Sequence, residues 1–259
     1  MALPQQSDRP AEQHRLAQEA IASQLVDMVR GQAWPEFDAS RIRETLPRLA
    51  ALVAALVRRY GMASATQAAA FYQAERAAQV PGRVSVPVES PPSLEQVTQE
   101  LKWATDNAWG VTTPEDMAVM ESKVVAAAER MTLDVGRDTI VAAVAKDRYA
   151  RGWARVTEPG ACHFCLMLAT RGAVYKNKAA AGVVDAKTAL GGDAKGEANR
   201  YHDNCRCHVE PLFGGAYEPT AQVRAAQQLW EKYAAGKPDP LNAFRRALSA
   251  ARNDGHPLL

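Results

Sequence analysis

The sequence has no long apolar run. Nowhere does it contain the roughly 20 consecutive apolar residues that a transmembrane helix needs. Its first thirty residues are polar and lack the apolar core of a signal peptide. We therefore expect a protein that has no membrane partner and that is made and folded in a reducing cytoplasm, where clustered cysteines favour a metal site over disulfides.

The sequence also lacks an excess of charge of either sign. The formal net charge is +2 over 259 residues, which is too small to predict nucleic-acid binding by itself. Glycine and proline are concentrated in a few segments, whereas alanine is abundant, so most of the chain has no helix breaker. The composition therefore predicts a mainly α fold.

Apolar residues at helical spacing predict three N-terminal helices, over residues 10–30, 40–60 and 64–78. Gly61 follows the last turn of the second helix and is interpreted as its end. Ser64, with Gln67 three residues later, resembles a capping box and predicts the start of the third helix.

Residues 80–92 form a proline-punctuated connector, and its prolines argue against pairing in a central sheet. Ser93 and Gln96 form a second capping box, which predicts a helix of about fifteen residues. Thr113 and Pro114 predict the start of another helix, which could be the longest in the protein. Gly136 within that helix predicts a kink or a close helix crossing.

Helical periodicity weakens after Trp153, and both cysteine motifs lie in the segment that follows. The sequence thus predicts three parts. These are a helical region over residues 1–153 with the extended linker 80–92, a small α+β module of cysteines and histidines over residues 154–215, and C-terminal helices within residues 216–259. The last two helices are expected at about 220–235 and 240–252, the second with Asp239 as N-cap and Pro240 as its first residue.

All four cysteines lie in two short motifs, a C-x2-C formed by Cys162 and Cys165 and a C-x-C formed by Cys205 and Cys207. His202 precedes Cys205 by three residues. Thiolates and neutral imidazoles suit zinc, which prefers four ligands in a tetrahedron. These five candidates are one more than the ion needs. Our first choice is the four cysteines, with His202 as a neighbour or a substitute for one of them, and a structural zinc ion as the cofactor.

Other uses of these cysteines stay open. They could pair as disulfides in an oxidising setting, or simply be buried, because a free cysteine packs like a small hydrophobe. A thioredoxin-like redox motif would need a helix that starts at the C-x2-C after a strand in a βαβ unit, whereas a long predicted helix and a turn precede it here. His163 and His208 are weaker ligand candidates, because each directly follows a cysteine and would point elsewhere.

An enzymatic metal site is a further alternative. A catalytic zinc keeps one coordination position open for water, with a general base close by. Glu158, Asp203 and Glu210 are near in sequence, but a cysteine-rich shell is more typical of structural sites. We therefore expect a protein that is not an enzyme and has no catalytic residues. A zinc-ribbon module that binds DNA is the main alternative, and a metal-dependent nuclease is a weaker one.

The residues around these motifs resemble the Mu F-like (MuF) minor head proteins of tailed bacteriophages, in particular those of actinobacterial phages. The resemblance rests on Cys162 and Cys165 with residues 168–175 after them, and on residues 201–207 with Pro211 and Phe213. The family has a similar H-x-N-C-R-C signature near the end of its domain. The motif match covers about residues 150–215, and a looser helical match covers most of the rest.

The resemblance implies a minor capsid protein with a structural role in head morphogenesis, and with a further role in DNA packaging or ejection. It implies a place in the virion head near the portal, after a stay in the host cytoplasm during assembly. The implied partners are the portal protein and other head proteins, with packaged DNA as a further one and several copies of the chain in each particle.

Overall fold

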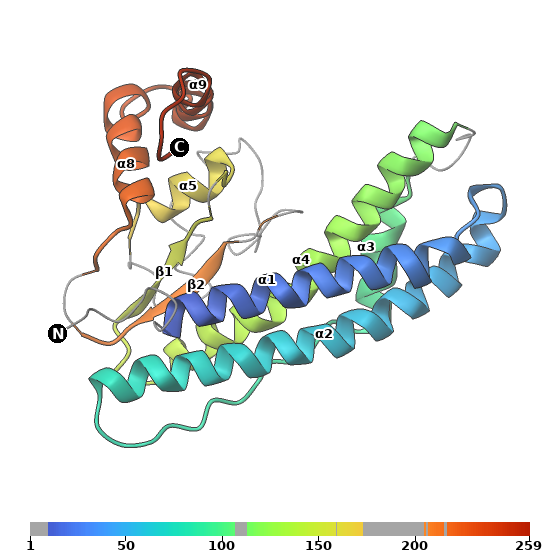
Figure 1. Ribbon diagram of the computed structural model, residues 1–259, viewed down its shortest axis with the longest axis horizontal. Helices are drawn as coiled ribbons and strands as arrows, with labels where there is room; N and C mark the ends of the chain where they lie inside the picture. Colours follow the sequence, from blue (N-terminus) through green and yellow to red (C-terminus); the bar gives the residue numbers. More distant parts are fainter. Residues whose placement is uncertain (1–9, 107–112, 159, 173–204, 206, 215–216) are drawn as a thin grey trace. The chain divides into compact units, whose positions relative to one another are not determined.

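A computed structural model of the chain describes residues 10–106, 113–158, 160–172, 205, 207–214 and 217–259. The described residues are 71% helical and form seven α-helices and a sheet of two strands (Figure 1). The predicted fold class, mainly α with a small α+β module, is confirmed. None of the described helices has both the length and the apolarity to cross a membrane.

The chain divides into two compact units. The first contains α1 (Pro10–Met28), most of α2 (Ile42–Gln79), α3 (Leu94–Ala104) and most of α4 (Pro114–Lys146). The second contains the ends of α2 and α4, then β1 (Gly152–Val156), α5 (His163–Ala169), β2 (His208–Leu212), α8 (Ala221–Tyr233) and α9 (Pro240–Asn253). A π-helical turn (Val29–Ala33) and two short 3-10 turns (Trp34–Glu36 and Ala39–Arg41) lie between α1 and α2.

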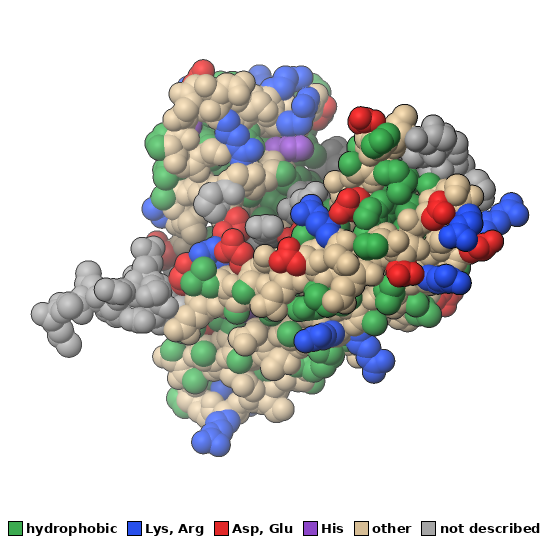
Figure 2. Space-filling view, turned by 45° about the vertical axis from the view of Figure 1, so that its right-hand side comes forward, with side chains coloured by type: hydrophobic (Ala, Val, Ile, Leu, Met, Phe, Trp, Pro, Cys, Tyr) green, Lys and Arg blue, Asp and Glu red, His purple; other side chains and the backbone are tan. Residues whose placement is uncertain are grey.

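One hydrophobic cluster forms the core of the first unit, and α1, α2, α3 and α4 all contribute to it. In α2 the buried residues recur three or four positions apart, at Leu49, Val53, Val57 and Tyr60, so they lie on one face of the helix. On the side of the molecule drawn in Figure 2, acidic and basic side chains are interspersed along the helices of this unit, which is the pattern of an ordinary solvated surface.

The prediction of separate helices over residues 40–60 and 64–78 is wrong, because α2 is continuous from Ile42 to Gln79. At 38 residues α2 is also longer than α4, which has 33, so α4 is not the longest helix. Ser64 is not an N-cap, since its hydroxyl donates to Oε1 of Gln18 in α1 at 2.6 Å. The alanine-rich sequence after Gly61 favours propagation of the helix, and one glycine costs only about 1 kcal/mol.

The small residues of α2 are explained by a close crossing with α4. A Cβ added to Gly61 would lie 2.9 Å from Cγ2 of Val135, and a Cβ added to Gly136 would lie 2.3 Å from Oγ of Ser64. The close crossing predicted at Gly136 is therefore confirmed, and Gly61 is part of the same contact instead of a helix end. Both glycines allow the two helices to approach more closely than any larger residue would.

The capping residues that the sequence identified at other helix starts are confirmed. Ser93 and Gln96 form both hydrogen bonds of the capping box at α3, although that helix has 11 residues instead of about fifteen. The Asp116 amide donates to Oγ1 of Thr113 at 3.2 Å, and the Asn242 amide donates to Oδ1 of Asp239 at 3.1 Å. Local side-chain chemistry thus determines where these helices begin.

The second unit combines a β-ribbon with three helices. β1 and β2 pair antiparallel, with Gly152 opposite Leu212 and Val156 opposite His208. The helices α5, α8 and α9 supply a separate apolar cluster. Its buried members are Leu166, Met167, Leu168, Ala226, Ala234, Leu241, Phe244 and Leu248.

A buried ion pair ties the chain segments at one end of this unit. Nε of Arg76 lies 2.6 Å from Oδ2 of Asp147, and both side chains are more than nine-tenths buried. The same guanidinium donates to the carbonyl oxygen of Gly82 at 2.8 Å. One side chain thus links the end of α2, the start of the connector and the residue after α4.

Replacing Gly136 by alanine tests the helix crossing. Gly136→Ala should lower the free energy of unfolding by about 1–3 kcal/mol, because the new methyl group overlaps Ser64. Denaturant unfolding measures this loss. Gly31→Ala is the matched control, since a Cβ there meets nothing within 4 Å. The control should be neutral or stabilising by up to about 1 kcal/mol, and an equal loss in both variants would contradict a close contact at Gly136.

Candidate metal centre

Three cysteines from the two motifs converge inside the second unit. The Sγ atoms of Cys165, Cys205 and Cys207 all lie within 4.8 Å of one another, and those of Cys165 and Cys205 are 3.3 Å apart. All three side chains are buried, with at most 4% of their surface exposed. We call these three residues the thiol cluster. It brings together residues that are 40 positions apart in the chain.

Cys162, the fourth cysteine, lies beside the thiol cluster but outside it. It is the N-cap of α5, and its Sγ accepts a hydrogen bond from the Cys165 amide at 3.3 Å. Cys162 is also partly exposed, unlike the other three cysteines. A sulfur that accepts one N–H bond can still bind a cation through another lone pair, so this cap does not prevent Cys162 from serving as a ligand.

Two of the other sequence candidates lie outside the described part of the chain. His202, the fifth proposed ligand, lies outside the described residues, and so does Asp203, which the sequence suggested as a general base. His163, in the first turn of α5, is not a member of the thiol cluster.

The β-ribbon determines which side chains face the thiol cluster. Because side chains alternate along a strand, Cys207 and Val209 lie on one face of the ribbon and His208 and Glu210 on the other. Arg155 pairs with Val209 and therefore shares the face of Cys207. Its Nη1 lies 3.8 Å from Sγ of Cys165.

Two thiols of the cluster, those of Cys165 and Cys207, are hard to ionise without a cation. Hydrogen bonds with Cys162, Cys205 and Cys207, together with burial, raise the pKa of Cys165 far above its ordinary value. The pKa of Cys207 is raised to about 12. A hydrogen bond with Cys165 and the charge of Arg155 act to lower it, but the hydrogen bond with Cys205 and burial outweigh them.

A metal ion reverses this balance, because a coordinated thiol is deprotonated outright. Three buried sulfur donors this close together could hold a metal ion, and soft thiolate ligands select ions such as zinc, copper(I) or the irons of iron–sulfur clusters. The chemistry of the donor set therefore fits a metal of this class.

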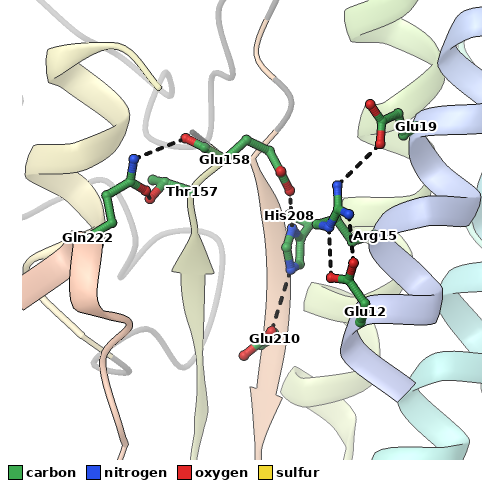
Figure 3. Close-up of polar contacts among 8 residues, drawn as sticks. All are labelled: Glu12, Arg15, Glu19, Thr157, Glu158, His208, Glu210 and Gln222. Carbon is green, nitrogen blue, oxygen red and sulfur yellow. Dashed lines mark hydrogen bonds and ion pairs between the residues drawn. The ribbon is translucent and has the colours of Figure 1, made fainter. Parts of the chain in front are cut away.

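His208 belongs to a different polar group on the opposite face of the ribbon. Its Nδ1 lies 3.6 Å from Oε1 of Glu158, and its Nε2 lies 3.5 Å from Oε1 of Glu210, so the two carboxylates flank the ring (Figure 3). Burial lowers the pKa of His208, but its contacts with both glutamates outweigh burial, and the net shift is upward. His208 thus points away from the thiols. Two of the three sequence candidates for a general base, Glu158 and Glu210, flank its ring.

The start of α5 differs from the expectation for the C-x2-C motif. The C-x2-C motif does start a helix after a strand, because β1 lies between α4 and α5. This strand pairs antiparallel with β2 and is not part of a βαβ unit. The thioredoxin-like hypothesis therefore has the helix start that it needs but lacks the βαβ setting.

Arg155 lies outside both cysteine motifs, and the motifs alone do not predict its place beside them. The only available signal was an arginine between apolar residues, in the segment Trp153-Ala154-Arg155-Val156. That segment had not been recognised as a strand, because both of its faces are buried and it shows no alternation of apolar and polar residues.

Removal of the metal should destabilise the second unit. If the ion is present at about 1,000 times its Kd, a strong chelator should withdraw about 4 kcal/mol of stabilisation and lower the Tm of the wild-type protein. The double variant Cys165→Ser/Cys207→Ser is the control. Its Tm should be low already and should not respond to the chelator. A wild-type Tm that stays unchanged in chelator would contradict a metal in the thiol cluster.

The model of the VG15 protein family matches the chain over residues 5–249. The searches of curated proteins and of solved structures gave no match. The family is one of viral, phage-type gene products, which agrees with the bacteriophage protein that the resemblance implied. Because the match covers almost the whole sequence, the chain belongs to the VG15 protein family.

Proposed function

We propose that the protein is a minor capsid protein of a bacteriophage head, of the MuF type, with a structural zinc ion in its second unit. The observation that carries the proposal is membership of a phage protein family over residues 5–249. The cysteine motifs and the thiol cluster support the finer assignment, because they are the features on which the resemblance to MuF proteins rests.

Zinc is the metal that best suits the donor set. Zinc takes four ligands without a redox change, and structural zinc sites are commonly made of cysteines spaced as short pairs. The thiol cluster supplies three of them, and Cys162 at the N-cap of α5 is the nearest candidate for the fourth. His202 remains the alternative fourth ligand, as the sequence suggested.

The role we propose is structural and not enzymatic. A structural zinc shell is closed, whereas a catalytic one keeps a position for water. The burial of Cys165, Cys205 and Cys207 favours the closed kind. In this proposal the protein stands near the portal in several copies per particle, binds the portal protein and other head proteins, and assists head assembly, DNA packaging or ejection.

A zinc-ribbon module that binds DNA is the second candidate. The observation in its favour is the β-ribbon that carries Cys207 beside the thiol cluster. The small net charge of +2 gives it less support. Binding through phosphate contacts should weaken steeply with salt, so DNA affinity that falls steeply between 50 and 200 mM salt would favour this candidate.

Elemental analysis tests whether the purified protein contains a metal ion, and which one. Protein purified without chelator should contain about one zinc ion per chain, since a closed shell of four ligands holds a single ion. Copper or iron in place of zinc would contradict the assignment of zinc but would still support a metal site in the thiol cluster. Protein that carries no metal, and that takes up none on refolding with zinc, would contradict the site itself.

Mass spectrometry of purified phage particles tests the role. The chain should be present in particles at a copy number close to that of the portal protein and far below that of the major capsid protein, and chemical cross-links should join it to the portal protein. Those two proteins serve as internal standards, and a nonstructural phage protein serves as the negative control. Absence of the chain from mature particles would contradict a virion role.

A further inference from the structure

Arg155 is among the most deeply buried side chains of the described residues. Only 2% of its surface is exposed, although its guanidinium is charged at all accessible pH values. Its neighbours Trp153 and Ala154 in β1 are buried as well. Burial of a charged group is costly unless an opposite charge or good hydrogen bonds offset the cost.

The pairing of β1 with β2 directs this charge toward the cysteines. Arg155 lies opposite Val209, two residues after Cys207, and Nη1 of Arg155 points to Sγ of Cys165 at 3.8 Å. Arg155 thus reaches a cysteine of the first motif from a strand that contains neither motif.

The benefit of this arrangement depends on the charge of the sulfurs. A hydrogen bond from a guanidinium to an anion is roughly twice as strong as one between neutral groups. Protonated thiols are weak acceptors, whereas metal-bound thiolates are anionic. Four thiolates around a divalent cation leave a net charge of −2, and a buried guanidinium beside them offsets part of it.

We propose that Arg155 is a positioning residue of the metal centre, which holds the thiol cluster in its anionic, metal-binding form. The proposal rests on the metal site of the proposed function. It assigns to Arg155 a contribution to metal affinity, beyond any contribution to the packing of β1. Groups that support metal ligands from outside the coordination shell typically change metal affinity by 10–100-fold when they are removed.

Zinc affinity of the full-length protein is the measurement, by competition with a chromophoric chelator. Arg155→Met removes the charge and keeps much of the volume, and Arg155→Lys keeps the charge without the planar fork. Arg151→Met is the matched control, because Arg151 lies on the same segment, directly before β1, and is exposed. We expect Arg155→Met to weaken zinc binding 10–100-fold, Arg155→Lys to weaken it less, and Arg151→Met to leave it unchanged.

A second readout separates this role from a purely structural one. Tm is measured for each variant with saturating zinc and again after removal of zinc. If Arg155 supports anionic sulfurs, the increase in Tm produced by a fixed zinc concentration should shrink in Arg155→Met, because weaker binding gives less stabilisation. If Arg155 only packs β1, the Tm of both forms should fall together, with zinc affinity unchanged, and that result would overturn the proposal.

Two further outcomes are decisive. If Arg155→Met does not fold even with zinc, the folding and zinc binding of Arg155→Lys become the test. A lysine variant that folds and binds zinc supports the need for a charge, and one that also fails to fold counts against it. Wild-type protein that binds no zinc would overturn the metal site and this proposal together, whereas normal wild-type affinity that is unchanged in Arg155→Met would overturn the role of Arg155 alone.

Discussion

The convergence of three thiols is the constraint on which the second unit depends. A ribbon of two strands is marginally stable by itself, and the apolar cluster beside it draws its buried members from α5 and from the segment that includes α8 and α9. Cys165 belongs to α5, whereas Cys205 and Cys207 lead into β2. The thiol cluster therefore joins the helical part of the unit to the ribbon. A metal ion bound there would contribute folding free energy directly.

The ribbon also separates two groups of polar side chains, one built around sulfur atoms and the other around carboxylates. One face carries Cys207 and Arg155, and the other carries His208 between Glu158 and Glu210. Buried polar groups are tolerated when their partners are close, and each face supplies such partners from its own residues. Alternation along β2 places Glu210, whose carboxylate is a hard oxygen ligand, on the face opposite Val209 and its partner Arg155. This separation favours a soft metal in the thiol cluster.

Local signals in the sequence predicted the helix starts at Ser93, Thr113 and Asp239, because capping depends on a few neighbouring residues. The same local rules failed at Gly61 and Ser64, where contacts with α4 and α1 determine the residue type and the helix simply continues. β1 was missed because a strand buried on both faces has no alternating pattern. Cysteine spacing predicted a common site, but the role of Arg155 depends on strand register, which the sequence does not reveal.

Metal binding and disulfide formation are competing uses of the same sulfurs. Sγ of Cys165 lies 3.3 Å from Sγ of Cys205, so the two thiols are close enough to react with each other if oxidised. A metal ion needs the same two sulfurs as separate thiolate ligands, so a disulfide between them would leave the site without two of its donors. A bound ion would in turn hold both sulfurs in metal–sulfur bonds, where they no longer act as free thiolates. Occupancy of the thiol cluster by a metal and formation of this disulfide therefore exclude each other.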